Sequence, residues 1–371
     1  MAPTPPPSEP ENKPVAETTP EPEKKPEPTT LPPLPIAYVG IIAVLLVVAG
    51  LGAGLAIGTI ARPSATPQPT PVRTAAVPTP TPIPTTDPRV FRQSLTGACG
   101  TEQGLWVVTN GGGLLRYDGE HWTQIDSTLR TLTHASCDAG TLYAVGPVGA
   151  MLIIDDRLRQ ITSFDVTLAD LIGVAAMPEG AMAVGTAGTV MFLSGGSWQE
   201  YARGLEEDLH AIVAFGPQSA WVVGSQGASY RLEAAGWRPV PTGVTVALRA
   251  VWGTGPQSAV AAGDAGTLLV FDGTWKPVET GVTTNLRAIA RLGTVTLIVG
   301  DGGTVLSFAS AGGAPSTPAP APITKIDIGT TCDLRSVFVN GQDAWIIGST
   351  GSRGGVWRVR DGKVGEKWGD C

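Results

Sequence analysis

The chain has little charge, few aromatic residues and few side chains that bind metal ions. Of its 371 residues, 15% are charged and 6% are aromatic, and the formal net charge is −7. Nucleic-acid binding needs a basic face, so this composition argues against a nucleic-acid partner. The three His and four Cys include no C-x-x-C pair, and a metal site built by the protein is therefore not indicated.

Sequence patterns of common catalytic sites are also missing. There is no G-x-S-x-G nucleophile elbow, and the glycines at 111–113 lack the Lys and the helix of a phosphate loop. Glycoside hydrolysis needs two placed carboxylates, whereas Glu206, Glu207 and Asp208 are typical of a solvated edge. We therefore predict no catalytic residues, no cofactor and no metal.

The first 88 residues differ in composition from the rest and divide into three segments. Residues 1–35 are rich in Pro, Glu, Thr and Lys, cannot bury enough apolar surface, and are predicted to be a disordered tail. Residues 36–61 contain no charge and, as a helix about 39 Å long, would span the ~30 Å core of a bilayer. Residues 62–88 are rich in Thr and Pro, which is typical of a stiff stalk.

The orientation of this predicted transmembrane helix is not set by charge. Lys24 and Lys25 precede the span, while Arg62 and Arg73 follow it, so the positive residues balance. The stalk and the placement of all four Cys beyond the span favour a cytoplasmic N-terminus and an exported C-terminal domain. A domain that faces the cytoplasm is the alternative.

The span also contains small residues at a regular spacing. Gly50, Gly54 and Gly58 form two overlapping G-x-x-x-G spacings, which let two membrane helices approach closely. Either the helix forms a homodimer through this face, or Gly is simply common in membrane helices.

The region after the stalk is a repeat. A Leu begins a short apolar strand at intervals of 37 to 39 residues, with a last interval of 48. A second strand ends at a residue that is Gly in six copies and Thr in the first. The Leu anchors are Leu95, Leu132, Leu171, Leu209, Leu248, Leu286 and Leu334, and the strand-ending residues are Thr109, Gly146, Gly185, Gly224, Gly263, Gly300 and Gly348.

Each copy divides into four short strands, most clearly in the fifth copy at 248–252, 259–263, 267–271 and 275–278. A two-residue turn between Gly263 and Gly266 and an Asp272-Gly273 pair predict tight turns between strands. Seven copies of four antiparallel strands are typical of a propeller. We therefore predict an all-β, seven-bladed β-propeller of four-stranded antiparallel blades over 89–371, with an insertion at 310–322 in blade six that explains the long interval.

The recurring Asp-Gly pairs and Trp residues are predicted to be structural, because a catalytic residue is needed only once. Trp side chains after the turns and in the second strands fill the wedges between blades. The alternative is an aromatic binding cage. These residues are Trp122, Trp198, Trp237 and Trp275 after the turns, and Trp106, Trp221 and Trp345 in the second strands.

The pattern L-R-A-V-x-G-x-G-P-Q-S-A-x-x-V-G-x-x-G-T-x-x-x-x-D-G-x-x-W resembles the repeats of BNR-type and photosystem II assembly factor-like propellers. These lie in the broad WD-repeat-like and quinoprotein-like superfamily. The resemblance covers 95–371 and implies a non-enzymatic assembly or binding protein, or else a sialidase-like enzyme or glycan-binding propeller. The D-G-T-W at 272–275 departs from the S-x-D-x-G-x-T-W Asp-box, which argues against the glycosidase branch.

One position does not repeat. The residue after the Leu anchor is Thr96, Thr133, Ile172, His210, Arg249, Arg287 and Arg335 in turn. If the first strand is innermost, His210, Arg249, Arg287 and Arg335 form a basic crescent at the mouth of the central channel. Guanidinium groups suit anionic ligands such as carboxylates. Alternatively, these Arg pair with acids such as Asp208 and Asp333 and lock the blades together.

The four cysteines suggest two disulfides by their position. Cys99 and Cys137 lie near the ends of the first two innermost strands, and Cys332 and Cys371 lie one repeat apart. Four cysteines allow three connectivities, and free buried thiols remain an alternative.

The predicted function is therefore that of a single-pass membrane protein whose extracytoplasmic propeller acts as a non-catalytic binding or assembly scaffold. The expected partner is another protein or an anionic or glycan ligand.

Overall fold

The computed structural model describes residues 92–101, 104–125, 131–155, 160–201, 205–309, 322–369 and 371, and two short strands before them. The predicted tail at 1–35 and the predicted transmembrane helix at 36–61 lie outside the described residues, as does most of the predicted stalk. Within the described ranges, no helix is both long and apolar enough to cross a membrane.

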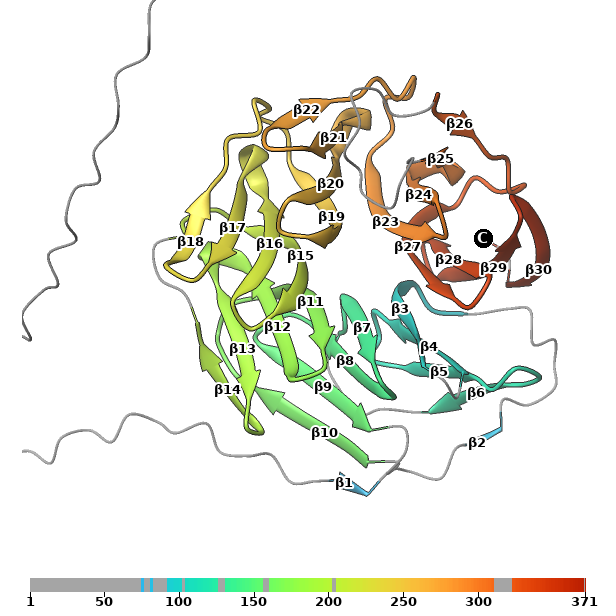
Figure 1. Cartoon of the computed structure of the whole chain (residues 1–371). Helices are drawn as coiled ribbons and strands as arrows, with labels where there is room; N and C mark the ends of the chain where they lie inside the picture. Colours follow the sequence, from blue (N-terminus) through green and yellow to red (C-terminus); the bar gives the residue numbers. More distant parts are fainter. Residues whose placement is uncertain are drawn as a thin grey trace, which may run out of the picture. The chain divides into compact units, whose positions relative to one another are not determined.

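Seven antiparallel sheets surround a central axis and form the predicted propeller (Figure 1). Blades one to three contain β3 (Leu95–Thr101), β4 (Gly104–Thr109), β5 (Leu114–Tyr117), β6 (Trp122–Ile125), β7 (His134–Asp138), β8 (Thr141–Val145), β9 (Ala150–Asp155), β10 (Gln160–Asp165), β11 (Leu171–Met177), β12 (Gly180–Gly185), β13 (Val190–Ser194) and β14 (Ser197–Glu200).

The remaining blades follow the same order along the chain. Blades four to seven contain β15 (Leu209–Gly216), β16 (Ser219–Gly224), β17 (Ser229–Glu233), β18 (Gly236–Pro239), β19 (Leu248–Gly255), β20 (Ser258–Gly263), β21 (Leu268–Phe271), β22 (Trp275–Pro277), β23 (Leu286–Leu292), β24 (Val295–Gly300), β25 (Val305–Ala309), β26 (Thr324–Lys325), β27 (Asp333–Asn340), β28 (Asp343–Thr350), β29 (Arg353–Arg360) and β30 (Lys363–Gly369). Four 3-10 turns are described as η1 (Thr186–Gly188), η2 (Ser225–Gly227), η3 (Asp264–Gly266) and η4 (Asp301–Gly303).

The two landmarks of the sequence repeat meet across the first hairpin of a blade. In blade five, Leu248 of β19 pairs with Gly263 of β20, and the corresponding pair recurs in five other blades. A Cβ on Gly263 would lie 2.2 Å from the carbonyl oxygen of Ala247, so a larger residue cannot fit. This close approach explains why the strand ends in Gly.

The turn that follows is one residue longer than the sequence predicted. The backbone N–H of Gly263 donates to the carbonyl of Thr267, which closes a three-residue turn over η3. Gly266 belongs to this turn with a φ of +70°. The preceding residue, Ala265, also has a positive φ of 55°, so the turn needs two residues in the left-handed region.

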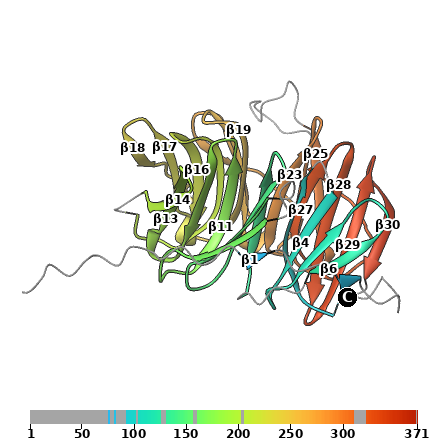
Figure 2. The same ribbon diagram turned by 90° about the horizontal axis from the view of Figure 1, so that it is seen from below.

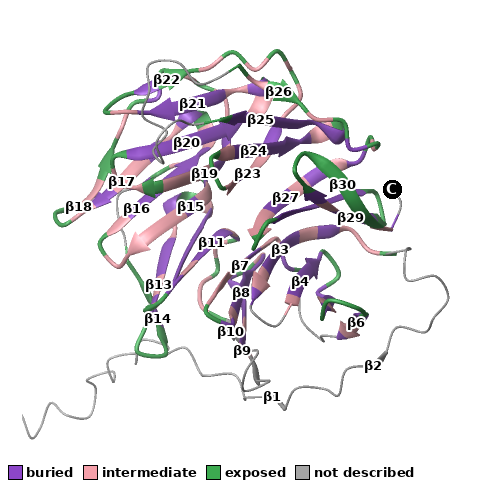
Figure 3. Ribbon diagram, turned by 45° about the vertical axis from the view of Figure 1, so that its right-hand side comes forward, coloured by how far each residue is buried: buried purple, intermediate pink, exposed green. Residues whose placement is uncertain are grey.

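The core consists of apolar layers between neighbouring blades. Buried residues concentrate on the middle strands, and exposed residues on turns and outermost strands such as β30 (Figure 3). Trp221 of blade four is fully buried against Phe271 and Trp275 of blade five, with ring centroids 4.7 and 5.3 Å away. The repeated Trp residues at this junction therefore fill the wedge between blades.

Two blades have five strands instead of the predicted four. Two short strands from the segment predicted to be a stalk, β1 (Ala75–Ala76) and β2 (Thr81–Pro82), pair with the outer strands β10 and β6. An uncovered blade edge offers free backbone groups, and an extended segment nearby satisfies some of them.

The ring closes by contact between the first blade and the last, which lie side by side (Figure 2). Apart from β1 and β2, each blade is built from consecutive strands, and among the described residues no strand is shared between the first blade and the last. The hydroxyl of Ser349 donates to the carbonyl of Leu95 at 3.2 Å, and Tyr117 and Trp122 of blade one pack with Trp345 and Trp368 of blade seven.

Candidate functional site

The residue after the Leu anchor occupies a bulge in the innermost strand. In blade five, Leu248 pairs with Gly263 and Ala250 pairs with Ala262, so Arg249 has no opposite residue. The same register shift occurs at this position in blades one, three, four, six and seven. A bulge re-aims its extra side chain, and in blades four to seven this residue lines the channel, whereas Thr96, Thr133 and Ile172 are not in the lining.

The first strands of all seven blades line a central cavity of about 340 Å³. His210, Arg249, Arg287 and Arg335 are in its lining, so four successive blades contribute the predicted crescent. The described residues that line this cavity include three arginines and no Asp or Glu. The cavity wall therefore presents guanidinium groups, while the carboxylates that pair with them stand behind the wall.

Two of these arginines are held by carboxylates that stay outside the cavity lining. Arg249 donates from Nε and Nη2 to Asp264 at 2.5 and 2.8 Å, and these bonds to the Asp264 carboxylate raise the pKa of Arg249. Arg287 forms the same paired bonds with Asp301. Burial acts to raise the pKa of Asp301, but the bonds and charge of Arg287 outweigh it and lower that pKa overall.

These ion pairs lie within single blades, because each Asp belongs to the turn that follows the second strand of the same blade. They therefore fix the arginine side chains and do not bridge blades.

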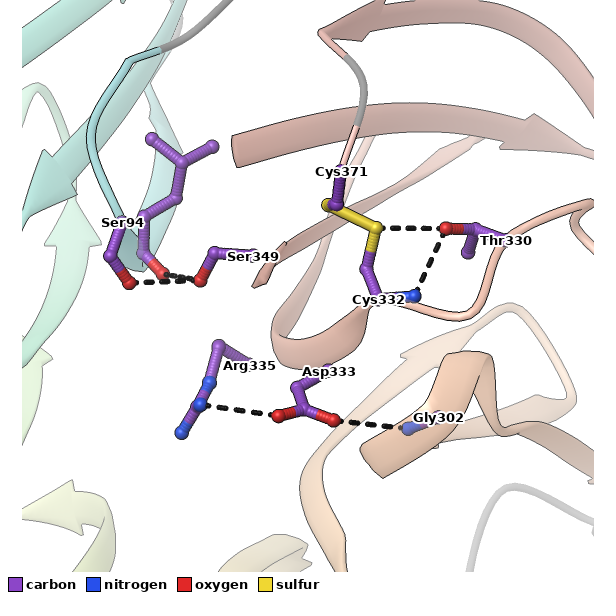
Figure 4. Close-up of a disulfide and its surroundings, with 9 residues drawn as sticks. Ser94, Gly302, Thr330, Cys332, Asp333, Arg335, Ser349 and Cys371 are labelled. Carbon is purple, nitrogen blue, oxygen red and sulfur yellow. Dashed lines mark hydrogen bonds and ion pairs between the residues drawn. A yellow bond between two sulfur atoms is a disulfide. The ribbon is translucent and has the colours of Figure 1, made fainter. Parts of the chain in front are cut away.

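Arg335 is held more loosely than the other two. Its Nη2 lies 3.5 Å from Asp333 Oδ2, and its side chain is 37% exposed (Figure 4). Asp333 also accepts the backbone N–H of Gly302 in the preceding blade at 3.2 Å. Asp208, the other acid considered as an arginine partner, instead accepts the backbone N–H of Ala187 at 2.9 Å.

His210 lies beside the arginines but adds no charge to them. Its Nδ1 donates to the carbonyl of Leu248 at 3.0 Å, which joins blade four to blade five. Burial, with a smaller effect from the Arg249 charge, lowers the pKa of His210. The positive charge of the crescent therefore comes from its three arginines.

Other lining residues were not singled out from the sequence. His134 and Ser136 of β7 accept backbone N–H groups of Val174 and Ala176 at 3.4 and 3.0 Å. Burial lowers the pKa of His134 to about 4, so it is neutral at pH 7. Trp252 and Phe338 lie further along their strands. A reading of every residue on the first strands, and not only the one after the anchor, would have included them.

The cysteines form two disulfides in the structure, Cys99–Cys137 and Cys332–Cys371, and none of the described cysteines is free. Cys99 and Cys137 join the innermost strands of blades one and two and line the cavity. Cys332, just before β27, joins Cys371, just after β30, and fastens the chain end to blade seven (Figure 4).

No protein-family model and no curated protein sequence matches this chain. Solved structures match its fold at low sequence identity. The WD40 repeats of RRP9 align at 12% identity with a TM-score of 0.59, covering 74% of this chain and 93% of that one. YCF48 from Cyanidioschyzon merolae aligns at 13% identity with a TM-score of 0.55, covering 73% and 96%.

The WD40 β-propeller domain of Doa1 aligns at 11% identity with a TM-score of 0.58, covering 73% of this chain and 94% of that one. Similarity at such identity establishes architecture and leaves the BNR-type assignment a prediction. The chain thus contains an all-β, seven-bladed propeller like those of the WD40 and YCF48 structures.

Proposed function

We propose that the propeller is a non-catalytic binding scaffold that engages an anionic group of a partner at the channel mouth. One observation carries this proposal: the described cavity lining presents three arginines and no carboxylate. The aspartates behind Arg249 and Arg287 fix two guanidinium groups in place, which reduces the entropy lost when an anion binds.

The alternative is a sialidase-like enzyme or glycan-binding propeller. Glycoside hydrolysis generally uses two carboxyl groups on either side of the scissile bond. The described lining of the cavity offers no carboxyl group, and the hydroxyls of Ser136 and Ser336 do not replace such a pair. This lining favours a binding role over a hydrolytic one.

The proposal places the propeller outside the cytoplasm, anchored by residues 36–61. Two disulfides support this location, because disulfides persist in oxidising compartments. Deleting 36–61 should move the protein from the membrane fraction to the supernatant. Retention of the deleted form in carbonate-washed membranes would contradict the anchor.

The same span is proposed to associate as a homodimer through Gly50, Gly54 and Gly58. Replacing all three by Ile should abolish cross-linked dimers in membranes while insertion is kept. Dimers of undiminished yield would show that the glycines are not the contact.

The partner site is tested by replacing Arg249, Arg287 and Arg335 with Ala together. Proteins captured from native membranes by the full chain should be lost with the triple variant. Arg238 of β18 is an exposed arginine away from the channel, so Arg238→Ala is the matched control. Unchanged capture by a triple variant with a native circular dichroism spectrum would overturn the proposed site.

A further inference from the structure

The central cavity has a charged end and an end with two aromatic residues, where the guanidinium of Arg291 lies 5.5 Å from the centroid of the Trp252 ring. Arg249 and Trp252 both line it and lie three residues apart on β19, which is roughly 10 Å along a strand. Phe338 contributes a second aromatic ring, and Val251 and Ile289 line the wall between the ends. Blades one and three contribute mainly small residues to the lining.

We infer that this cavity binds a small organic carboxylate, with its anionic head on the arginine crescent and a compact apolar body towards Trp252 and Phe338. The inference rests on the proposed role of the crescent as a binding site and names the chemical class of its ligand. A volume of about 340 Å³ falls in the range of small-molecule sites, about 300–1,000 Å³, which combine apolar walls with a few placed polar groups.

The three arginines keep donor groups that an anionic head can bond. Arg249 and Arg287 use Nε and Nη2 for Asp264 and Asp301, and those carboxylates lie outside the lining. The Nη1 groups are not part of these pairs, and a guanidinium can bond two acceptors through different edges. Arg335 has only a 3.5 Å bond to Asp333 and is the most available of the three.

The apolar wall separates this ligand from an inorganic anion. Phosphate or acetate would bond the arginines but would not reach the apolar lining residues at Trp252 and Phe338. A neutral ligand of the same shape would pack against the apolar lining residues but would give the guanidinium groups no charged acceptor. A carboxylate with an apolar body satisfies both ends.

The test is isothermal titration of the full chain in a neutral detergent with 3-phenylpropionate, and with 3-phenylpropanamide and acetate for comparison. We expect 3-phenylpropionate to bind at least about tenfold more tightly than either, because a bond to a charged group contributes about 1.5–3 kcal/mol. Equal affinity for the amide, or no heat from 3-phenylpropionate up to about 10 mM, would overturn the inference.

Two substitutions, one at Arg335 and one at its partner Asp333, should change the affinity for 3-phenylpropionate in opposite directions. Arg335→Gln should weaken 3-phenylpropionate binding by about tenfold or more, since it removes one charged donor. Asp333→Asn keeps an acceptor for Gly302 but removes the competing charge, so it should strengthen binding severalfold. Arg238→Gln should leave the affinity unchanged.

The same affinity in Arg335→Gln and the native chain would refute the site. These titrations also separate the inference from the proposed function. If 3-phenylpropionate fails to bind while partner capture still needs the arginines, only the inference is wrong. If 3-phenylpropionate binds but the triple arginine variant still captures the partner, the proposed partner site is wrong.

Discussion

At the scale of single residues, the side chain before the Leu anchor bonds the preceding blade in four of the seven blades. Asp170 accepts the backbone N–H of Val148 at 2.8 Å, and Asp208 accepts that of Ala187 at 2.9 Å. The donors have positive φ values of 55° and 51°. Asp208, which the sequence predicted to lie on a solvated edge, thus stabilises a strained turn of the preceding blade.

Val148 is the least suitable residue for this turn, because a β-branched side chain is disfavoured at positive φ. Its side chain is 46% exposed, so Val148→Gly loses little packing. Relief of the backbone strain, less the added freedom of Gly in the unfolded chain, should stabilise the protein by about 0.5–1 kcal/mol. Urea unfolding measures this change. Val148→Ala, which keeps the Cβ, should gain less, and a destabilised Gly variant would contradict the assignment.

Asp343 is a buried carboxylate with two cationic partners. Hydrogen bonds from Arg360 first, and then from Arg358, lower its pKa from 3.8. Because the pKa of Asp343 is lower in the folded protein than in the unfolded chain, its ionised form stabilises the fold at pH values above the unfolded pKa. This contribution to the free energy of unfolding is lost as the pH falls through the pKa of the folded protein.

Asp343→Asn should therefore cost about 1–3 kcal/mol at pH 7, because it removes bonds between charged groups. The difference in free energy of unfolding between the variant and the native chain should decrease as the pH falls below about 4. Urea unfolding at pH 7 and at pH 3 tests this, with the exposed Glu179→Gln as control. The same difference in free energy of unfolding at pH 7 and pH 3 would mean that the charge of Asp343 does not stabilise the fold.

At the scale of elements, the disulfides fasten strands that the ladders alone do not join. Cys99–Cys137 connects two innermost strands, β3 and β7, from different blades. Cys332–Cys371 ties the end of the exposed outermost strand β30 to the start of the innermost strand β27. The sequence indicated these pairs by spacing, but only the fold brings their Cα atoms to 5.6 and 5.8 Å.

Each disulfide closes a long loop, with sequence separations of 38 and 39. The chain-entropy model gives up to about 4 kcal/mol for a loop of this length, and about 2–4 kcal/mol is typical. The Cys332→Ser/Cys371→Ser variant should lose that much in urea unfolding and exchange the β30 amides faster. The Cys99→Ser/Cys137→Ser variant should keep slow exchange in β30. Equal rates of amide exchange in β30 in the two variants would show that the Cys332–Cys371 disulfide does not stabilise this strand.

At the scale of the whole molecule, the ring closes without a shared strand. Many buried contacts must therefore hold blade one to blade seven. Leu95 is fully buried at this junction, and a Cβ on Gly354 would lie 2.5 Å from its Cγ. The chain ends of the ring thus meet through close apolar packing and the aromatic cluster around Trp345.

Leu95→Ala should destabilise the propeller by about 2–5 kcal/mol, because it leaves a cavity in the closing interface. Since every blade needs two neighbours, we expect Trp fluorescence and far-ultraviolet circular dichroism to report one coincident transition. Two separate transitions would show that the ring opens at this junction before the blades unfold. Val364→Ala on exposed β30 is the control and should change stability little.

The sequence alone determined the number of blades, their four main strands and the places of the turns, although not the length of the turn after the second strand. Leu248 and Gly263 recur because each blade repeats the same close contact, and steric requirements of this kind leave a period in the sequence. It also singled out Arg249, Arg287 and Arg335, because they are where the repeat varies.

Only the tertiary structure decided what those variable residues contact. The bulge turns Arg249 into the channel, while Asp264, which lies 15 residues away, folds back to hold it. Likewise, the fold places β1 and β2 on blade edges and brings His134, Trp252 and Phe338 into one cavity. Asp264 reaches Arg249 through the hairpin of one blade, whereas the residues of the cavity come from different blades and meet only because the ring closes, which leaves no period along the chain.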